Sequence, residues 1–135
     1  MNMPEENEFK RNKASKSHNK FKVAFNGLKV VLCEESSAKM QLCILVLACL
    51  LGVYLNLSDM EWIIIIVMST IVFTLEIMNT AIEYIVDVIS PEFNQIAGKI
   101  KDIAAGAVLL STMTSVLIGI IIYLPKILLK IKEII

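Results

Sequence analysis

The residues best suited to chemistry lie in the stretch 76–87, EIMNTAIEYIVD, which continues an apolar run that begins at Trp62. A helical period of about 100° per residue puts Glu76, Glu83 and Asp87 on one stripe, with Asn79 and Thr80 beside it. Carboxylates in a membrane helix are costly and usually mark function. The stripe therefore predicts a functional site.

The residue types indicate what that site could do. Carboxylate oxygens suit a hard cation such as Mg²⁺, which often bridges nucleotide phosphates, and a carboxylate in apolar surroundings can accept a proton. A neighbouring lysine can neutralise phosphate charge. These parts are typical of phosphoryl transfer to a hydroxyl at the lipid interface. The same residue types also suit a small oligomeric ion or proton pathway, or a non-catalytic assembly subunit in which the carboxylates pair with Lys39 or Lys101.

The elements that must position these residues are helices in a membrane. The chain has 135 residues, is 56% hydrophobic, and has no formal net charge. With a mean hydropathy of +0.71, it is predicted to be an all-α integral membrane protein of a single domain. Its periodicity predicts a disordered polar tail over 1–20, an amphipathic surface helix over 21–39, and spans over 40–57, 62–89 and 103–124. Pro91 and Pro125 are expected to end the second and third spans.

The basic residues predict the orientation in the cytoplasmic membrane. Eight of the 13 lysines and arginines precede the first span, two lie in the 90–102 connection and three follow the last span. The N-terminus and that connection should therefore be cytoplasmic and the C-terminus outside. Glu76 then lies roughly 21 Å along the helix from Trp62, and Glu83 roughly 31 Å, at the cytoplasmic interface. Glu35, Lys101 and Asp102 converge on the same side.

Several other classes of protein are not expected. Three cysteines, beside the distant and single His18, match neither a disulfide framework nor a zinc site, and they are interpreted as buried free thiols. The only Gly-Lys pair, Gly98-Lys99, lacks the rest of a phosphate-binding loop. The basic segment over 10–22 could contact anionic lipid headgroups or remain solvated. It has no folded reading element, so nucleic acid is not an expected partner.

Four motifs carry a resemblance to a known family. EIMNTAIEYIVD is followed by KDIAAGAVLL and preceded by NGLKVVLCEESSAK and by the EW dipeptide at 61–62. Over roughly 21–124 the chain resembles the prokaryotic diacylglycerol kinase family, which includes the undecaprenol kinases of Gram-positive bacteria. The resemblance implies a homotrimeric membrane lipid kinase domain over 21–135 with a surface helix and three spans. It also implies transfer of the ATP γ-phosphate, with Mg²⁺, to a lipid alcohol.

The resemblance also implies roles for individual residues. Glu76 would be the general base, Asn79 would orient substrate or base, Glu35 and Glu83 would bind the Mg²⁺ on ATP, and Lys101 and Asp102 would contact the nucleotide. Further candidates are Glu34, Lys39, Thr80 and Asp87. Glu34 could share or replace the role of Glu35, and the run Ser36-Ser37-Ala38 is smaller than its family counterpart.

The sequence leaves alternatives open for the lipid acceptor and for the packing of the spans. Diacylglycerol and undecaprenol both place a hydroxyl at the interface, and the gapless NTAIEYIVD run with the long basic N-terminus favours undecaprenol. Residues 1–20 have no counterpart that can be aligned. Gly52, Gly106 and the alanines of KDIAAGAVLL offer close-approach surfaces, either between copies or within one chain.

Overall fold

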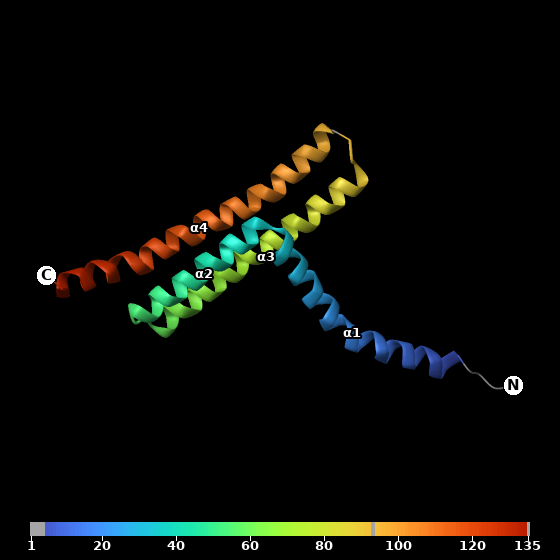
Figure 1. Ribbon diagram of the computed structural model, residues 1–135, viewed down its shortest axis with the longest axis horizontal. Helices are drawn as coiled ribbons and strands as arrows, with labels where there is room; N and C mark the ends of the chain where they lie inside the picture. Colours follow the sequence, from blue (N-terminus) through green and yellow to red (C-terminus); the bar gives the residue numbers. More distant parts are fainter. Residues whose placement is uncertain (1–4, 93, 135) are drawn as a thin grey trace. The chain divides into compact units, whose positions relative to one another are not determined.

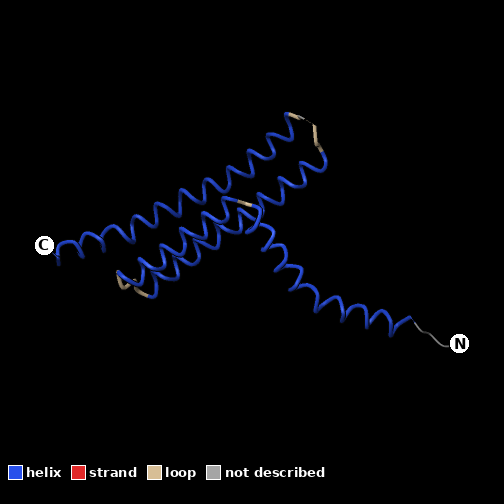
Figure 2. Tube along the Cα trace, in the orientation of Figure 1, coloured by secondary structure: helices blue, strands red, loops and turns tan. Residues whose placement is uncertain are grey.

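The computed structural model describes residues 5–92 and 94–134, and the side chains of residues 20–92 and 94–133. Over these residues the chain is helical, with four helices and no strand. It divides into two compact units, Met1–Glu35 and Ser36–Ile135. Figure 1 shows the helices along the chain and Figure 2 the short connections between them.

The N-terminal unit consists of α1, Glu5–Glu34. This helix begins well inside the segment for which we expected a disordered tail, and it ends before the predicted limit at residue 39. The expectation rested on the lack of apolar periodicity in the polar sequence before residue 21, and a helix without an apolar face gives no such signal. The division into a tail and a kinase domain stays a prediction, as does the position of α1 on a membrane surface. The apolar side chains of Phe21 and Phe25 are exposed.

The second unit contains α2 (Ser36–Tyr54), α3 (Asp59–Ile89) and α4 (Gln95–Ile134). Each of these three helices is long and apolar enough to cross a membrane. The 31 residues of α3 extend about 46 Å, more than the bilayer core of about 30 Å. In Figure 1, α4 runs back alongside α3 in the opposite direction.

The ends of α3 follow the sequence prediction closely. At its start, the backbone N–H of Ser58 donates to Glu61 Oε2 over 2.7 Å, which satisfies a terminal amide. At its end, the Ser90 N–H still bonds to the Val86 carbonyl over 2.8 Å, and the helix stops before Pro91. The prediction that Pro91 ends this span is confirmed.

The bounds of α4 differ from the prediction at both ends. It begins at Gln95 rather than 103 because Asn94 Oδ1 caps it, accepting from the backbone N–H of Ile96 over 2.8 Å and of Ala97 over 3.3 Å. It continues through Pro125, where we expected it to end, as far as Ile134. Proline removes one helical hydrogen bond, but membrane helices tolerate proline where neighbouring groups satisfy the freed carbonyl.

The turn between α2 and α3 brings the helices close together. Asn56 adopts a φ of 51°, a left-handed conformation that asparagine tolerates. A Cβ on Gly52 would lie 3.0 Å from Trp62 Cη2 and 3.3 Å from Leu57 Cδ2. Gly52 therefore serves close packing within one chain, whereas a Cβ on Gly106 would meet nothing within 4 Å.

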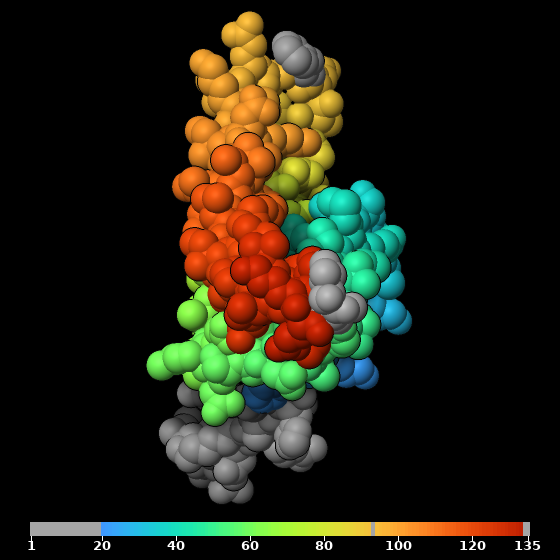
Figure 3. Space-filling model, turned by 90° about the vertical axis from the view of Figure 1, so that its left-hand side faces the viewer, coloured from blue at the N-terminus to red at the C-terminus, as the bar shows by residue number. Residues whose placement is uncertain are grey.

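The small core of this unit lies at the same end. It consists of four buried residues, Leu55, Leu57, Ile65 and Ile122. The Tyr123 hydroxyl donates to the Ala48 carbonyl over 2.8 Å, and Lys126 pairs with Glu61 over 3.0 Å. Figure 3 shows the red C-terminal part of α4 lying against the green α2–α3 turn. Most large apolar side chains elsewhere on these helices are exposed, as on a lipid-facing surface.

Candidate functional site

Glu76 is the centre of the polar site. Its side chain lies on α3 at only 5% exposure, and both carboxylate oxygens accept hydrogen bonds from α2. Ser37 Oγ donates to Glu76 Oε1, and Gln41 Nε2 donates to Oε2 over 3.3 Å. The hairpin of α2 and α3 therefore holds a buried carboxylate in a defined orientation.

One turn along α3, three predicted site residues are also bonded. The buried Thr80 hydroxyl donates to the Glu76 backbone carbonyl over 3.0 Å. Asn79 Nδ2 donates to Glu83 Oε1 over 2.7 Å, and its role in orienting the substrate or the base stays a prediction. Asn79 Oδ1 is buried and has no hydrogen-bond partner among the described residues. This amide oxygen is therefore an unused hydrogen-bond acceptor next to the Glu83 carboxylate.

The last member of the stripe connects α3 to α4. Asp87 Oδ1 pairs with Lys101 Nζ over 2.5 Å, with the two side chains 62% and 34% exposed. Asp102 is the next residue on α4 and is exposed. Lys101 and Asp102 thus lie at the same end of the α3–α4 pair as the stripe, as predicted from the sequence.

The remaining candidates lie around the junction of the two units. Glu34 is the last residue of α1, and Glu35 closes the N-terminal unit. Lys39 lies in the first turn of α2 and is exposed. Glu34 and Glu35 belong to the N-terminal unit and Glu76 to the other, so their roles beside Glu76 stay predictions. The role of Lys39, which shares a unit with Glu76, stays a prediction as well.

The fit of a metal ion depends on the oxygen atoms available. No group of three histidine, cysteine, aspartate or glutamate side chains is gathered for a metal within the described part of the chain. Glu83 and the unpartnered Asn79 Oδ1 nevertheless present oxygen donors one turn apart. Oxygen donors of this kind fit Mg²⁺, which usually completes its coordination with water and nucleotide phosphates.

Sequence reasoning missed the two side chains that bind Glu76. In the sequence, Ser37 stands out only as part of a run of small residues, and Gln41 lies within an uncharged span. A signal was nevertheless available, because Ser37 and Gln41 are four residues apart and so share one face of the helix. A polar pair at that spacing, at the start of an otherwise apolar helix, points to a polar partner on a neighbouring helix.

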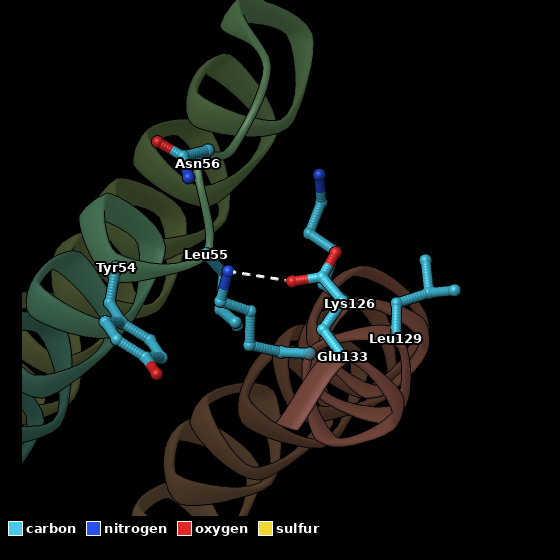
Figure 4. Close-up of a pocket in the computed structure, with 7 residues that line it drawn as sticks. Tyr54, Leu55, Asn56, Lys126, Leu129 and Glu133 are labelled. Carbon is cyan, nitrogen blue, oxygen red and sulfur yellow. Dashed lines mark hydrogen bonds and ion pairs between the residues drawn. The ribbon is translucent and has the colours of Figure 1, made fainter. Parts of the chain in front are cut away.

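Two pockets lie apart from the Glu76 carboxylate. A pocket of about 220 Å³ at the α2–α3 turn is lined by Tyr54 and Asn56 on one side and by Lys126 and Glu133 of α4 on the other. Figure 4 shows these four residues around the pocket. Lys130, which also lines the pocket, pairs with Glu133 over 3.0 Å. An apolar groove of about 430 Å³ lies between the end of α3 and the start of α4. Neither pocket includes the Glu76 carboxylate.

Three apolar helices that carry a buried, hydrogen-bonded carboxylate define a multi-pass membrane protein with an acidic site. The model of the prokaryotic diacylglycerol kinase family matches residues 22–123, most of the chain. The chain belongs to that family. This confirms the resemblance seen in the sequence motifs and favours a lipid kinase over an ion pathway or an assembly subunit.

Individual relatives agree with this assignment. The undecaprenol kinase of Bacillus subtilis (strain 168) is 44% identical over 75 residues, which is 56% of this chain and 61% of that enzyme. The diacylglycerol kinase of Helicobacter pylori (strain J99) is 37% identical over 94 residues, covering 67% and 73% of the two chains. The diacylglycerol kinase of Escherichia coli (strain K12) is 27% identical over 94 residues, covering 70% and 77%. The match to the undecaprenol kinase, at 61% of that enzyme, spans less than two thirds of its length.

Proposed function

We propose that the protein transfers the γ-phosphate of ATP to the hydroxyl of a lipid alcohol at the cytoplasmic face of the membrane. The observation that carries this proposal is the buried Glu76 carboxylate, held by two side chains of α2 in a chain of the diacylglycerol kinase family. The proposal concerns the whole activity, including its substrates.

Glu76 is assigned the role of general base. As the acceptor hydroxyl oxygen attacks the γ-phosphorus, Glu76 takes the hydroxyl proton, and the bond from the γ-phosphorus to the bridging oxygen of ADP breaks. Its burial supports this role, because a carboxylate shielded from water can meet a hydroxyl in the apolar layer. Asn79 orients Glu83, to which it is bonded.

The nucleotide is assigned to the polar end of the site. Glu35 and Glu83 are the proposed Mg²⁺ ligands, and Asn79 Oδ1 is a further oxygen donor for the ion. When bound, Mg²⁺ would neutralise negative charge on the phosphates. Lys101 and Asp102 are the proposed nucleotide contacts. Since Lys101 pairs with Asp87 in the structure, phosphate binding would exchange one anionic partner of the lysine for another.

The proposal also covers the oligomeric state of the protein, its orientation in the membrane and the identity of the lipid acceptor. A homotrimer is supported by the many apolar side chains exposed on α2 and α4 and by the open space beside Gly106. The lysine distribution supports a cytoplasmic N-terminus and 90–102 connection, with the C-terminus outside. Undecaprenol is favoured as the acceptor by the 44% identity to a protein named undecaprenol kinase. Diacylglycerol is the second candidate because other relatives are named diacylglycerol kinases.

The test uses the full-length protein purified in detergent micelles, with ATP labelled on its γ-phosphate, Mg²⁺, and either undecaprenol or diacylglycerol. We expect a labelled phospholipid, formed faster with undecaprenol. Exposed Glu133, far along α4, provides the matched control: Glu133→Gln should leave transfer unchanged. If neither lipid is phosphorylated, the kinase proposal fails. Proton flux in protein-containing liposomes would then support the ion-pathway interpretation.

A further inference from the structure

Two side chains of α2 bind the carboxylate that we assign as the base. Ser37 Oγ and Gln41 Nε2 each donate to a different oxygen of Glu76. These donors are four positions apart and so lie on one face of α2. Together they restrain both the position and the rotation of the carboxylate. We infer that Ser37 and Gln41 are positioning residues for Glu76, an inference that rests on the proposed kinase function.

The chemical nature of these donors matters. Burying a carboxylate at 5% exposure is costly unless hydrogen bonds replace its water. A lysine partner would also satisfy Glu76, but its positive charge would stabilise the anion and weaken it as a base. Ser37 and Gln41 are uncharged. They hold the carboxylate in place and leave its negative charge available for a proton.

Gln41 has a second feature that bears on the substrate. Its Oε1 is buried and has no hydrogen-bond partner among the described residues. This oxygen shares a carbon with the Nε2 that binds Glu76, so it lies beside the base. A buried acceptor without a donor is unfavourable, and the hydroxyl of the lipid alcohol is the donor that the proposed reaction brings there. Gln41 therefore contacts the acceptor hydroxyl as well as orienting Glu76.

The two residues should then differ in their kinetic effect. Ser37→Ala removes a hydrogen bond to the base alone, so kcat should fall about 10–100-fold while the KM for lipid and for ATP stays unchanged. Gln41→Leu removes a hydrogen bond to the base and the acceptor for the hydroxyl. It should lower kcat by a similar factor and also raise the lipid KM about tenfold. Ser37→Thr keeps the hydroxyl and should restore kcat.

The control separates a positioning role from a folding role. Thr114→Val removes an exposed hydroxyl that donates only to the Leu110 carbonyl of its own helix, over 2.9 Å, and should leave kcat and thermal unfolding unchanged. Ser37→Ala is expected to unfold within a few degrees of wild type. If Ser37→Ala loses activity only because it unfolds much earlier, the hydroxyl acts on the fold and the inference is overturned. If Ser37→Thr, which keeps the hydroxyl, fails to restore kcat, the hydrogen bond to Glu76 is not the cause of the loss and the inference is likewise overturned.

The wild type and Glu76→Gln are measured in the same assay. An inactive wild type, or a fully active Glu76→Gln, overturns the proposed function itself. If the wild type is active and Glu76→Gln is not, but Ser37→Ala and Gln41→Leu both turn over normally, the proposed function stands. Only the positioning role is then overturned. Loss of kcat in both variants, with a raised lipid KM in Gln41→Leu alone, supports the inference in full.

Discussion

Replacing Glu76 with glutamine isolates the charge of the base from its shape. Glutamine has the same length as glutamate, so the side chain can keep its position in the α2–α3 hairpin. Its Oε1 can still accept from Ser37 Oγ. Its Nε2 would meet Gln41 Nε2, which puts two donors face to face where the wild type has a donor and an acceptor.

Rotation of one amide group relieves the clash between the two donors. The Ser37 hydroxyl can accept as well as donate, so a 180° turn of the new amide puts its Nε2 toward Ser37 Oγ and its Oε1 toward Gln41 Nε2. Gln41 keeps its wild-type orientation, with its Oε1 still available for the acceptor hydroxyl. Both hydrogen bonds of the site are then made in the variant. We therefore expect the free energy of unfolding to change by no more than about 1 kcal/mol, while the loss of the base lowers kcat by on the order of 10²–10⁴.

The assay measures both quantities on one preparation. Phosphate transfer is followed with labelled ATP and undecaprenol in mixed micelles, and thermal unfolding is followed in the same detergent. Glu76→Leu is the comparison for stability, because it leaves Ser37 and Gln41 without their acceptor and should unfold at a lower temperature than Glu76→Gln. A Glu76→Gln protein that unfolds normally and keeps more than about a tenth of wild-type kcat would refute the general-base role.

Three further predictions concern the frame of the site. Gly52→Ala should be less stable than Gly106→Ala by about 1–3 kcal/mol, because only at Gly52 does the new methyl meet an indole ring at 3.0 Å. Asn56→Val should lower stability by roughly 1–3 kcal/mol, since a β-branched residue is strained at a φ of 51°. Asp87→Asn should change stability by less than about 1 kcal/mol, because its ion pair with Lys101 is substantially exposed. Thermal unfolding in detergent measures all three.

Each of these three stability predictions has a control variant that tests its stated cause. Gly106→Ala serves as the reference for the first, and equal stability of the two alanine variants would contradict close packing at Gly52. Asn56→Gly, which tolerates a positive φ, should be close to wild type, and an equal loss in both Asn56 variants would contradict strain as the cause. Lys99→Gln alters an exposed charge two residues from Lys101 and sets the background for Asp87→Asn.

Much of the architecture could be predicted from the sequence because the signals are local. Apolar runs indicated three spanning helices, and Pro91 indicated the end of α3, as the structure confirms. The bounds of α4 were missed because its start depends on the Asn94 side chain folding back onto two backbone amides. Its continuation through Pro125 was missed because membrane helices can tolerate a proline that would end a helix in water.

The sequence by itself determined the class of protein and the acidic stripe. Helical periodicity is enough to put Glu76, Glu83 and Asp87 on one face of α3, since it depends only on residues a few positions apart. It could not identify Ser37 and Gln41 as the partners of Glu76, because those bonds join positions 39 and 35 residues apart. Which side chains meet across that distance depends on how α2 packs against α3. The tertiary structure alone decided that an uncharged hydroxyl and an uncharged amide hold the carboxylate.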